Sequence, residues 1–349
     1  MRLASRESSA RRIGPVGKMV AVDSVFRPAP LRPGDEVRVV APARSRTLVL
    51  EPDRTALIEQ RFADLGLKLS YGAHVDEIDD FTSSPIASRV ADLHDAFADP
   101  AVRGILTVIG GFNSNELLPH LDWDLIARNP KMLCGYSDIT ALQNAILART
   151  GLITYTGPHW STFGMRDHFE QTLAWFRHAA LGSDPYEIEP ANFWTDDLWF
   201  LDQDNRTPEP TTGWWPLQPG TAQGRLVGGN LCTFNLLQGG PYRPSLTGAV
   251  VLVEDDELTN PVQFARDLTS LLQLPDASQM TALIIGRFQR ASAVDRPILQ
   301  QIIERQPVLA GLPVLANIDI GHTNPLATLP IGGHIEVDSG TKPRLRVLR

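Results

Sequence analysis

The chain has 349 residues, of which 43% are hydrophobic, and its formal net charge at pH 7 is −8. This length favours two domains with sizeable cores, and the negative charge without a long basic run argues against nucleic acid or an anionic membrane surface as the partner. Apolar runs stay well short of the roughly 20 residues that span a bilayer.

Residues 1–28 predict a disordered leader, because they contain Arg and Ser but lack the apolar stretch of a secretory signal. Met19 is an alternative start to Met1. The two cysteines, Cys134 and Cys232, lie in apolar or glycine-rich surroundings and form neither a disulfide pattern nor a zinc pattern. They indicate a reducing, cytoplasmic compartment, and we expect no metal site.

Strands and helices alternate from residue 29 to residue 180. Apolar runs predict strands at residues 37–41, 67–71, 105–109, 132–135 and 153–155, and helices are predicted at 52–65, 84–98 and 138–148. Ser84 is expected to cap the second helix, with Pro85 in its first position. Such alternation is typical of a parallel sheet with helices on both faces, whose ligands gather at the carboxyl ends of the strands.

Residues 181–224 interrupt this alternation. They are rich in Pro, Asp and Thr and contain Trp194, Trp199, Trp214 and Trp215, which predicts an irregular linker or substrate loop. Residues 225–349 then predict a second, mixed α/β domain with barrel-like character. Its expected helices are 231–237, 261–272 and 296–304, and its expected strands are 249–253, 282–285, 314–317, 335–337 and 345–348.

Ser137 stands between a predicted strand and a predicted helix. A hydroxyl at this turn is exposed at the carboxyl end of the sheet, beside backbone N–H groups at the positive end of the helix dipole. This arrangement suits a nucleophile whose intermediate carries an oxyanion. The alternative is an ordinary Ser/Asp helix N-cap, which is far commoner. Gly110 and Gly111 also follow a strand.

A catalytic serine needs a base and an acid that orients the base. His322 is the best candidate among the eight histidines, because it lies in a Gly-His-Thr-Asn-Pro loop straight after a strand, although a hydrogen-bonded turn histidine is the alternative. Four carboxylates, residues 254–257, directly follow another strand. Glu254 is the best placed to be held at the strand end, but the spacing alone does not choose among the four.

Five motifs now identify a family. Residues 110–115, 135–140, 224–231, 253–255 and 321–325, in this order, closely resemble the serine peptidases that include LD-carboxypeptidases and the microcin C self-immunity protein. The resemblance runs from about residue 31 to the C-terminus. It implies an N-terminal Rossmann-like domain that carries the serine and a C-terminal domain that carries the other two catalytic groups.

The resemblance also implies a role for each site residue. Ser137 is the nucleophile, His322 the base and Glu254 the acid that orients it, and the N–H groups of Gly111 and Asp138 form the oxyanion hole. The family needs no cofactor, and we expect a homodimer that acts on a small molecule.

The substrate depends on the branch of the family. Residues 111–119 and the long Trp-rich loop resemble the microcin immunity branch, which cleaves the bond between a C-terminal amino acid and a nucleotide sulfamate or phosphoramidate. In this branch a Trp stacks on the nucleobase, and Trp199 is the best match for it, with Trp194 the next. The alternative is that these indoles only hold the loop onto the second domain. Asn230 resembles a position near the nucleotide but is also a plain N-cap, and Asn113 is a further expected contact.

The sequence also fits two other functions. The chain also fits an LD-carboxypeptidase that releases D-alanine from a cytoplasmic muropeptide tetrapeptide. A protein that binds an aminoacyl-nucleotide without cleaving it is the third possibility, although a pure binder does not need an aligned base.

Overall fold

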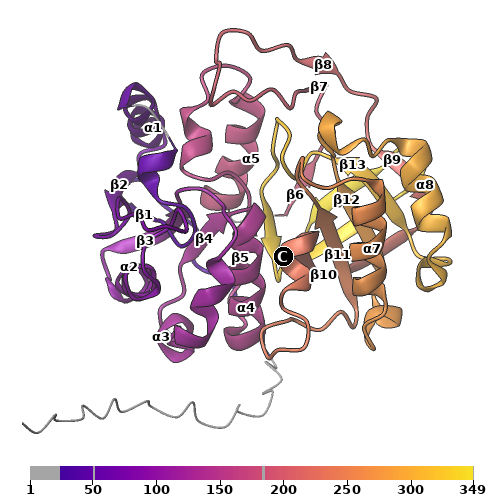
Figure 1. Cartoon of the computed structure of the whole chain (residues 1–349), viewed down its shortest axis with the longest axis horizontal. Helices are drawn as coiled ribbons and strands as arrows, with labels where there is room; N and C mark the ends of the chain where they lie inside the picture. Colours follow the sequence, from indigo (N-terminus) through magenta and orange to yellow (C-terminus); the bar gives the residue numbers. More distant parts are fainter. Residues whose placement is uncertain (1–23, 50–51, 183–184, 349) are drawn as a thin grey trace, which may run out of the picture.

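The alternating strands and helices of the first half of the chain form an N-terminal lobe around a six-stranded sheet with the order β14-β5-β4-β3-β1-β2 (Figure 1). The computed structural model describes residues 24–49, 52–182 and 185–348. The parallel strands are β1 (Glu36–Val40), β2 (Lys68–Tyr71), β3 (Val102–Thr107), β4 (Met132–Gly135) and β5 (Thr154–Thr156). The helices are α1 (Pro52–Asp64), α2 (Ile86–Ala98), α3 (Trp123–Arg128), α4 (Thr140–Thr150) and α5 (Glu170–Leu181).

The sixth strand of this sheet comes from the far end of the chain. Strand β14 (Leu329–Ile331) pairs antiparallel with β5, and all three of its residues are buried. The C-terminal part of the chain therefore completes the N-terminal sheet.

The C-terminal lobe is built on an eight-stranded mixed sheet with the order β6-β16-β15-β10-β11-β12-β13-β9. Its parallel centre comprises β10 (Thr221–Asn230), β11 (Ala249–Glu254), β12 (Ala282–Gly286) and β13 (Val314–Ile318). Antiparallel strands β15 (His334–Asp338) and β16 (Arg344–Val347) extend it, and β6 and β9 are its edges. The helices are α6 (Leu231–Asn235), α7 (Pro261–Leu272) and α8 (Arg296–Glu304). This is the α/β fold class that the sequence predicts.

The Trp-rich segment crosses from one lobe to the other along the top of Figure 1. It was expected to be irregular, but it contains β6 (Tyr186–Ile188), β7 (Phe193–Trp194), β8 (Glu209–Pro210) and β9 (Trp215–Gln218). Strands of two to four residues are too short to show an alternating pattern in the sequence. Two of them form the edges of the eight-stranded sheet, and β7 pairs with β8.

The structure differs from the sequence predictions at the start of α2 and at the start of the helix after Ser137, and it describes only the last part of the predicted leader. The residue at the N-cap of α2 is Pro85, without a side-chain cap, so the prediction of Ser84 as the cap is wrong. The helix after Ser137 begins with a 3₁₀ turn before α4. Most of the predicted leader, with Met1 and Met19, lies outside the described residues, whereas Phe26 forms a parallel bridge with Leu152.

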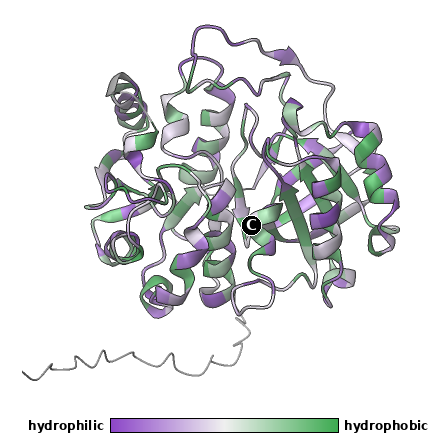
Figure 2. Ribbon diagram, viewed as in Figure 1, coloured by the Kyte–Doolittle hydropathy of each residue, from purple (hydrophilic) through white to green (hydrophobic). Residues whose placement is uncertain are grey.

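A continuous hydrophobic core joins the two lobes. Apolar residues gather on the strands of both sheets (Figure 2), and one buried cluster contains residues of α4 together with residues of β10 and β11. At the same place Asn144 of α4 donates to Gly228 O (2.9 Å) and accepts from Gly228 N (3.0 Å).

In the described part of the chain, no helix is long and apolar enough to span a membrane.

Candidate active site

Ser137 directly follows β4 in a backbone conformation that few residues other than glycine adopt. Its φ is +60°, in the left-handed region, where an L-residue is strained. The N-cap residues of the 3₁₀ turn and of α4 are Tyr136 and Ile139, and neither cap uses a side chain. The hydroxyl of Ser137 therefore does not cap the helix. The alternative interpretation of Ser137 as an ordinary helix N-cap is wrong.

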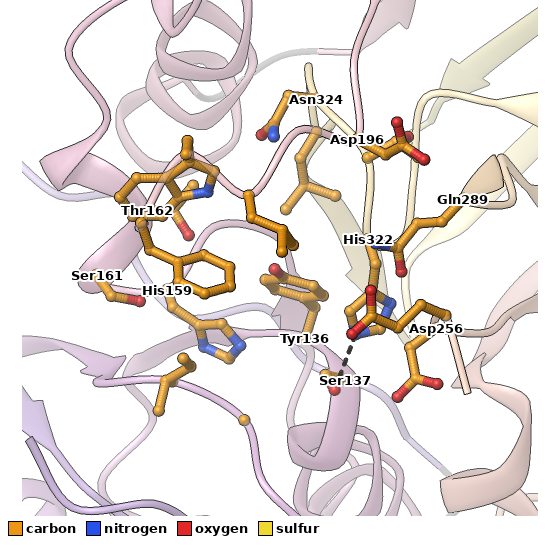
Figure 3. Close-up of a pocket in the computed structure, with 18 of the residues that line it drawn as sticks. Tyr136, Ser137, His159, Ser161, Thr162, Asp196, Asp256, Gln289, His322 and Asn324 are labelled. Carbon is orange, nitrogen blue, oxygen red and sulfur yellow. Dashed lines mark hydrogen bonds between the residues drawn. The ribbon is translucent and has the colours of Figure 1, made fainter. Parts of the chain in front are cut away.

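The predicted serine, histidine and glutamate lie in one chain of hydrogen bonds. Nδ1 of His322 donates to Oε2 of Glu254 at 2.9 Å. On the other side of the ring, Nε2 lies 3.1 Å from Oγ of Ser137, the bond drawn as a dashed line in Figure 3. Glu254 is the last residue of β11 and His322 follows β13, so the C-terminal lobe supplies both to a serine of the N-terminal lobe.

The charges around His322 favour its protonated form. Burial lowers the pKa of His322, but the negative charges of Glu254, Asp256 and Asp255 outweigh burial and raise this pKa above its ordinary value of 6.5. Glu254 itself is only 2% exposed. An imidazolium that formed during a reaction would therefore be stabilised where it stands.

The four consecutive carboxylates have different surroundings. Only Glu254 is hydrogen-bonded to His322. Asp255 is buried and accepts from the backbone N of Asp256, and burial together with Glu254 raises the pKa of Asp255 to about 7. Asp256 and Glu257 line the cavity in front of the serine. The structure thus distinguishes the four carboxylates by their contacts, whereas their spacing in the sequence does not.

Two glycines allow the backbone after β3 to pass close to its neighbours, Gly110 to Ser137 and Gly111 to Ala43. A Cβ on Gly110 would lie 2.9 Å from the Cβ of Ser137, and one on Gly111 would lie 3.0 Å from the Cβ of Ala43. The next turn is bound to the start of the helix, since Ser114 N donates to the Asp138 carboxylate at 2.9 Å. Gly111 lines the same cavity as Ser137, and Asp138 follows Ser137 in the chain; their role in an oxyanion hole stays a prediction.

A cavity of about 390 Å³ opens in front of Ser137 and His322. Trp199 lines it, as do four exposed apolar side chains at its rim: Phe112, Leu198, Phe200 and Leu258. The cavity takes its lining from both lobes and from the Trp-rich segment. A ligand that reached Ser137 would thus contact all three.

The other residues predicted to bind substrate are engaged elsewhere and do not line this cavity. The ring of Trp194 packs under the guanidinium of Arg290, 4.4 Å from the ring centroid. Asn230 caps α6 by accepting from Thr233 N at 3.1 Å. Asn113 donates its amide to Ser83 at 2.8 Å. Their expected role in binding stays a prediction.

Sequence reasoning missed two features of the site. His159 lines the cavity and is 1% exposed; its position just after the end of β5 was the available signal. Asp319, completely buried, forms an ion pair with Arg287 at 2.7 Å and accepts from the indole N–H of Trp214 at 2.9 Å. The hydrogen bond from Trp214 to Asp319 fastens the Trp-rich segment to the strand end that leads to His322.

Comparisons with known proteins show the family of the chain. Two family profiles match the chain: the LD-carboxypeptidase N-terminal domain over residues 37–157 and the LD-carboxypeptidase C-terminal domain over residues 223–337. YocD of Bacillus subtilis is 49% identical over 313 residues, which cover 89% of this chain and 96% of YocD. The microcin self-immunity protein MccF of Escherichia coli is 31% identical over 296 residues, 79% of this chain and 83% of MccF.

Solved structures show the same fold. An MccF-like protein from Bacillus anthracis superposes with a TM-score of 0.91 at 42% identity, covering 93% of this chain and 99% of that one. MccF in complex with glutamyl sulfamoyl guanosine gives a TM-score of 0.82 at 28% identity, covering 92% of this chain and 98% of that one. The resemblance stated from the motifs is confirmed: the chain belongs to the LD-carboxypeptidase family of peptidases, to which MccF is also related.

Proposed function

We propose that this chain is a serine hydrolase that cleaves the amide-type bond between a C-terminal amino acid and a nucleotide sulfamate or phosphoramidate. The observation that carries the proposal is the hydrogen-bond chain from Glu254 through His322 to Ser137. A protein that only sequestered its ligand would not need a base aligned on a strained serine.

Each of the three residues has one role in the proposed reaction. Oγ of Ser137 attacks the acyl carbon while Nε2 of His322 takes its proton, and Glu254 stabilises the imidazolium. His322 then gives this proton to the leaving nitrogen, the C–N bond breaks, and an acyl-enzyme remains. A water molecule, deprotonated by His322, releases the amino acid. The N–H groups of Gly111 and Asp138 hold the oxyanion of each tetrahedral intermediate.

The cavity and the relatives support a nucleotide as the leaving part of the substrate. Trp199 offers an aromatic face in the cavity, and a nucleobase of any kind stacks on such a face. The related MccF has been solved with glutamyl sulfamoyl guanosine and with aspartyl sulfamoyl adenosine. We further propose a cytoplasmic homodimer and the domain boundaries given above.

An LD-carboxypeptidase activity is the second candidate. The murein tetrapeptide carboxypeptidase of Pseudomonas aeruginosa is 28% identical over 228 residues, which cover 64% of this chain and 68% of that protein. The same three residues would act on a peptide bond, and the base-binding face of Trp199 would then have no role.

Hydrolysis assays on both substrates test the proposal. We expect the purified chain to hydrolyse an aminoacyl-sulfamoyl adenosine, and Ser137→Ala to lose nearly all turnover, since losing one member of a triad costs several orders of magnitude. Turnover of an LD-tetrapeptide alone would assign the chain to the second candidate. Retention of turnover within about tenfold in Ser137→Ala, or failure of a fluorophosphonate to label the native protein, would argue against the serine mechanism.

A further inference from the structure

His159 is a second imidazole in the cavity, separate from the proposed triad. It follows β5 and is 1% exposed, with Nδ1 2.7 Å from Oγ1 of Thr107. Its Nε2 is buried and has no hydrogen-bond partner among the described residues. Figure 3 shows the ring on the side of Tyr136 opposite His322. A buried nitrogen without a partner is costly, so its place in a ligand cavity needs a reason.

The surroundings of His159 keep the ring neutral and leave Nε2 as an acceptor. Burial, with a smaller effect of His322, lowers the pKa of His159 to about 3. The hydroxyl of Thr107 donates to Cys134 O at 3.3 Å, so its oxygen accepts the proton of Nδ1. A neutral imidazole with its proton on Nδ1 presents a lone pair at Nε2.

The position of His159 places this acceptor on the acyl side of the proposed reaction. The ring of Tyr136 lies between the two imidazoles, with its centroid 4.4 Å from that of His159 and 5.1 Å from that of His322. In the proposed function His322 protonates the leaving nitrogen, so the leaving group lies on its side. The opposite side of Tyr136 is then left for the amino-acid part of the substrate.

The cavity as a whole is lined by more negative than positive side chains, although Asp196 and Asp256 lie on the His322 side of Tyr136 (Figure 3). Its lining contains four carboxylates, those of Asp196, Asp197, Asp256 and Glu257, and one guanidinium, that of Arg44. Asp196 is paired with Arg290, but the other three carboxylates have no salt bridge within the described chain. This net negative charge favours the entry of a cationic substrate group into the cavity over that of an anionic one.

We propose that Nε2 of His159 accepts a hydrogen bond from the α-ammonium group of the amino-acid part of the substrate, and that His159 and Thr107 thereby select aminoacyl over simple acyl substrates. This role rests on the proposed function, because it uses the same cavity and the same acyl transfer. His159 positions the substrate and takes no part in proton transfer.

A comparison of two substrates tests this role. An aminoacyl-sulfamoyl adenosine and its des-amino analogue, which has hydrogen in place of the α-amino group, differ only in the proposed contact. We expect the native protein to show a KM for the analogue that is about tenfold or more higher. In His159→Leu this ratio should fall towards one, and His159→Gln, whose amide oxygen also accepts, should retain part of it.

Binding and stability separate this role from a structural one. Calorimetric titration of both ligands into Ser137→Ala and Ser137→Ala/His159→Leu should give the same change of ratio without turnover. His159→Leu should also be as stable as the native protein or more so, because Thr107 keeps Cys134 O as an acceptor and a partnerless buried nitrogen disappears. The matched control is His94→Leu: Nε2 of His94 accepts from Asp122 N at 2.9 Å, so this change should lower the melting temperature and leave the ratio unchanged.

Two other outcomes would be decisive. An unchanged ratio in His159→Leu, with normal hydrolysis of the aminoacyl substrate, would overturn the role of His159 and leave the proposed function intact. Failure of the native protein to hydrolyse either nucleotide, together with failure of Ser137→Ala to bind them, would overturn the proposed function and this inference with it.

Discussion

At Ser137 the chain holds a residue with a Cβ in a left-handed backbone conformation that glycine would adopt without strain. A left-handed conformation costs an L-residue about 1–2 kcal/mol, and its φ of +60° is fixed by the turn between β4 and the 3₁₀ helix. Such strain is tolerated where the position of a side chain matters more than stability. The hydroxyl is the part of Ser137 that contacts His322.

This strain leads to a prediction that separates stability from activity. Ser137→Gly should be more stable than Ser137→Ala by up to about 1 kcal/mol, because glycine adopts a positive φ freely, although its unfolded state gains entropy. Urea unfolding of both variants measures the difference. Both should be inactive. A Ser137→Ala variant as stable as Ser137→Gly would show that the turn is not strained.

The contact between Glu254 and His322 predicts a change in the pH profile. In the proposed reaction His322 must be neutral to accept a proton from Ser137. Burial lowers the pKa of His322, but Glu254 outweighs burial and raises this pKa above 6.5. Activity should therefore fall as the pH drops through this raised pKa. Glu254→Gln removes the negative charge, so the acid limb of kcat/KM should move to lower pH while the maximum falls about 10²- to 10⁴-fold.

A series of kcat/KM values between pH 5 and 9 (roughly the range in which histidine titrates) measures this shift. Glu257→Gln is the control, because Glu257 lines the cavity without touching His322 and its replacement should leave the acid limb in place. An acid limb that stayed at the same pH in Glu254→Gln would mean that another group, and not His322, limits the reaction at low pH.

At the scale of elements, the Trp-rich segment places its indoles in two different environments. Trp199 lines the cavity, whereas Trp194 in β7 packs against Arg290 and Arg287, with ring centroids 4.4 and 5.7 Å from the guanidinium carbons. The first is available to a ligand and the second holds the segment to the C-terminal lobe.

Replacing each Trp by Ala should therefore have different effects. Trp199→Ala should remove about 1–3 kcal/mol of base stacking and raise the KM for an aminoacyl-sulfamoyl nucleotide roughly 5- to 150-fold, with little change for a substrate without a base. Trp194→Ala should instead lower the free energy of unfolding by about 1–2 kcal/mol through its lost cation–π contacts. Equal losses with both substrates in Trp199→Ala would make that indole structural.

Sequence reasoning reached those parts of the site that depend on local chemistry. A serine between a strand and a helix and a histidine in a Gly/Asn/Pro loop carry their signal within a few residues, and the structure brings Ser137 and His322 together. Glu254 needed the family resemblance, because four adjacent carboxylates look alike until the fold buries one against His322.

Features that depend on distant contacts could not be predicted. The pairing of His159 with Thr107 joins residues 52 positions apart, and the ion pair of Asp319 with Arg287 joins two strand ends. Strand β14 is three residues long and enters the sheet of the other lobe, which no local pattern indicates.

At the scale of the whole molecule, the relative position of the lobes sets the distance between Ser137 and His322. Helix α4 follows Ser137, and β10 pairs with β11, which ends at Glu254. The side chain of Asn144 joins the two elements by bonding both the C=O and the N–H of Gly228. This contact therefore ties the helix that follows Ser137 to the strand beside the one that ends at Glu254.

Asn144→Ala should therefore lower both stability and activity. It leaves the C=O and the N–H of Gly228 without this partner, at a cost of about 2–4 kcal/mol in the free energy of unfolding. Since a misplacement of about 1 Å can cost a catalytic site 10²-fold, we expect kcat/KM to fall tenfold or more at a temperature where the variant is folded. Asn129→Ala is the matched control: its amide donates to Leu125 O at 2.8 Å within the N-terminal lobe, so it should cost stability and leave kcat/KM unchanged. If Asn144→Ala lost stability while kcat/KM stayed the same, the contact between the lobes would hold the fold together without setting the distance from His322 to Ser137.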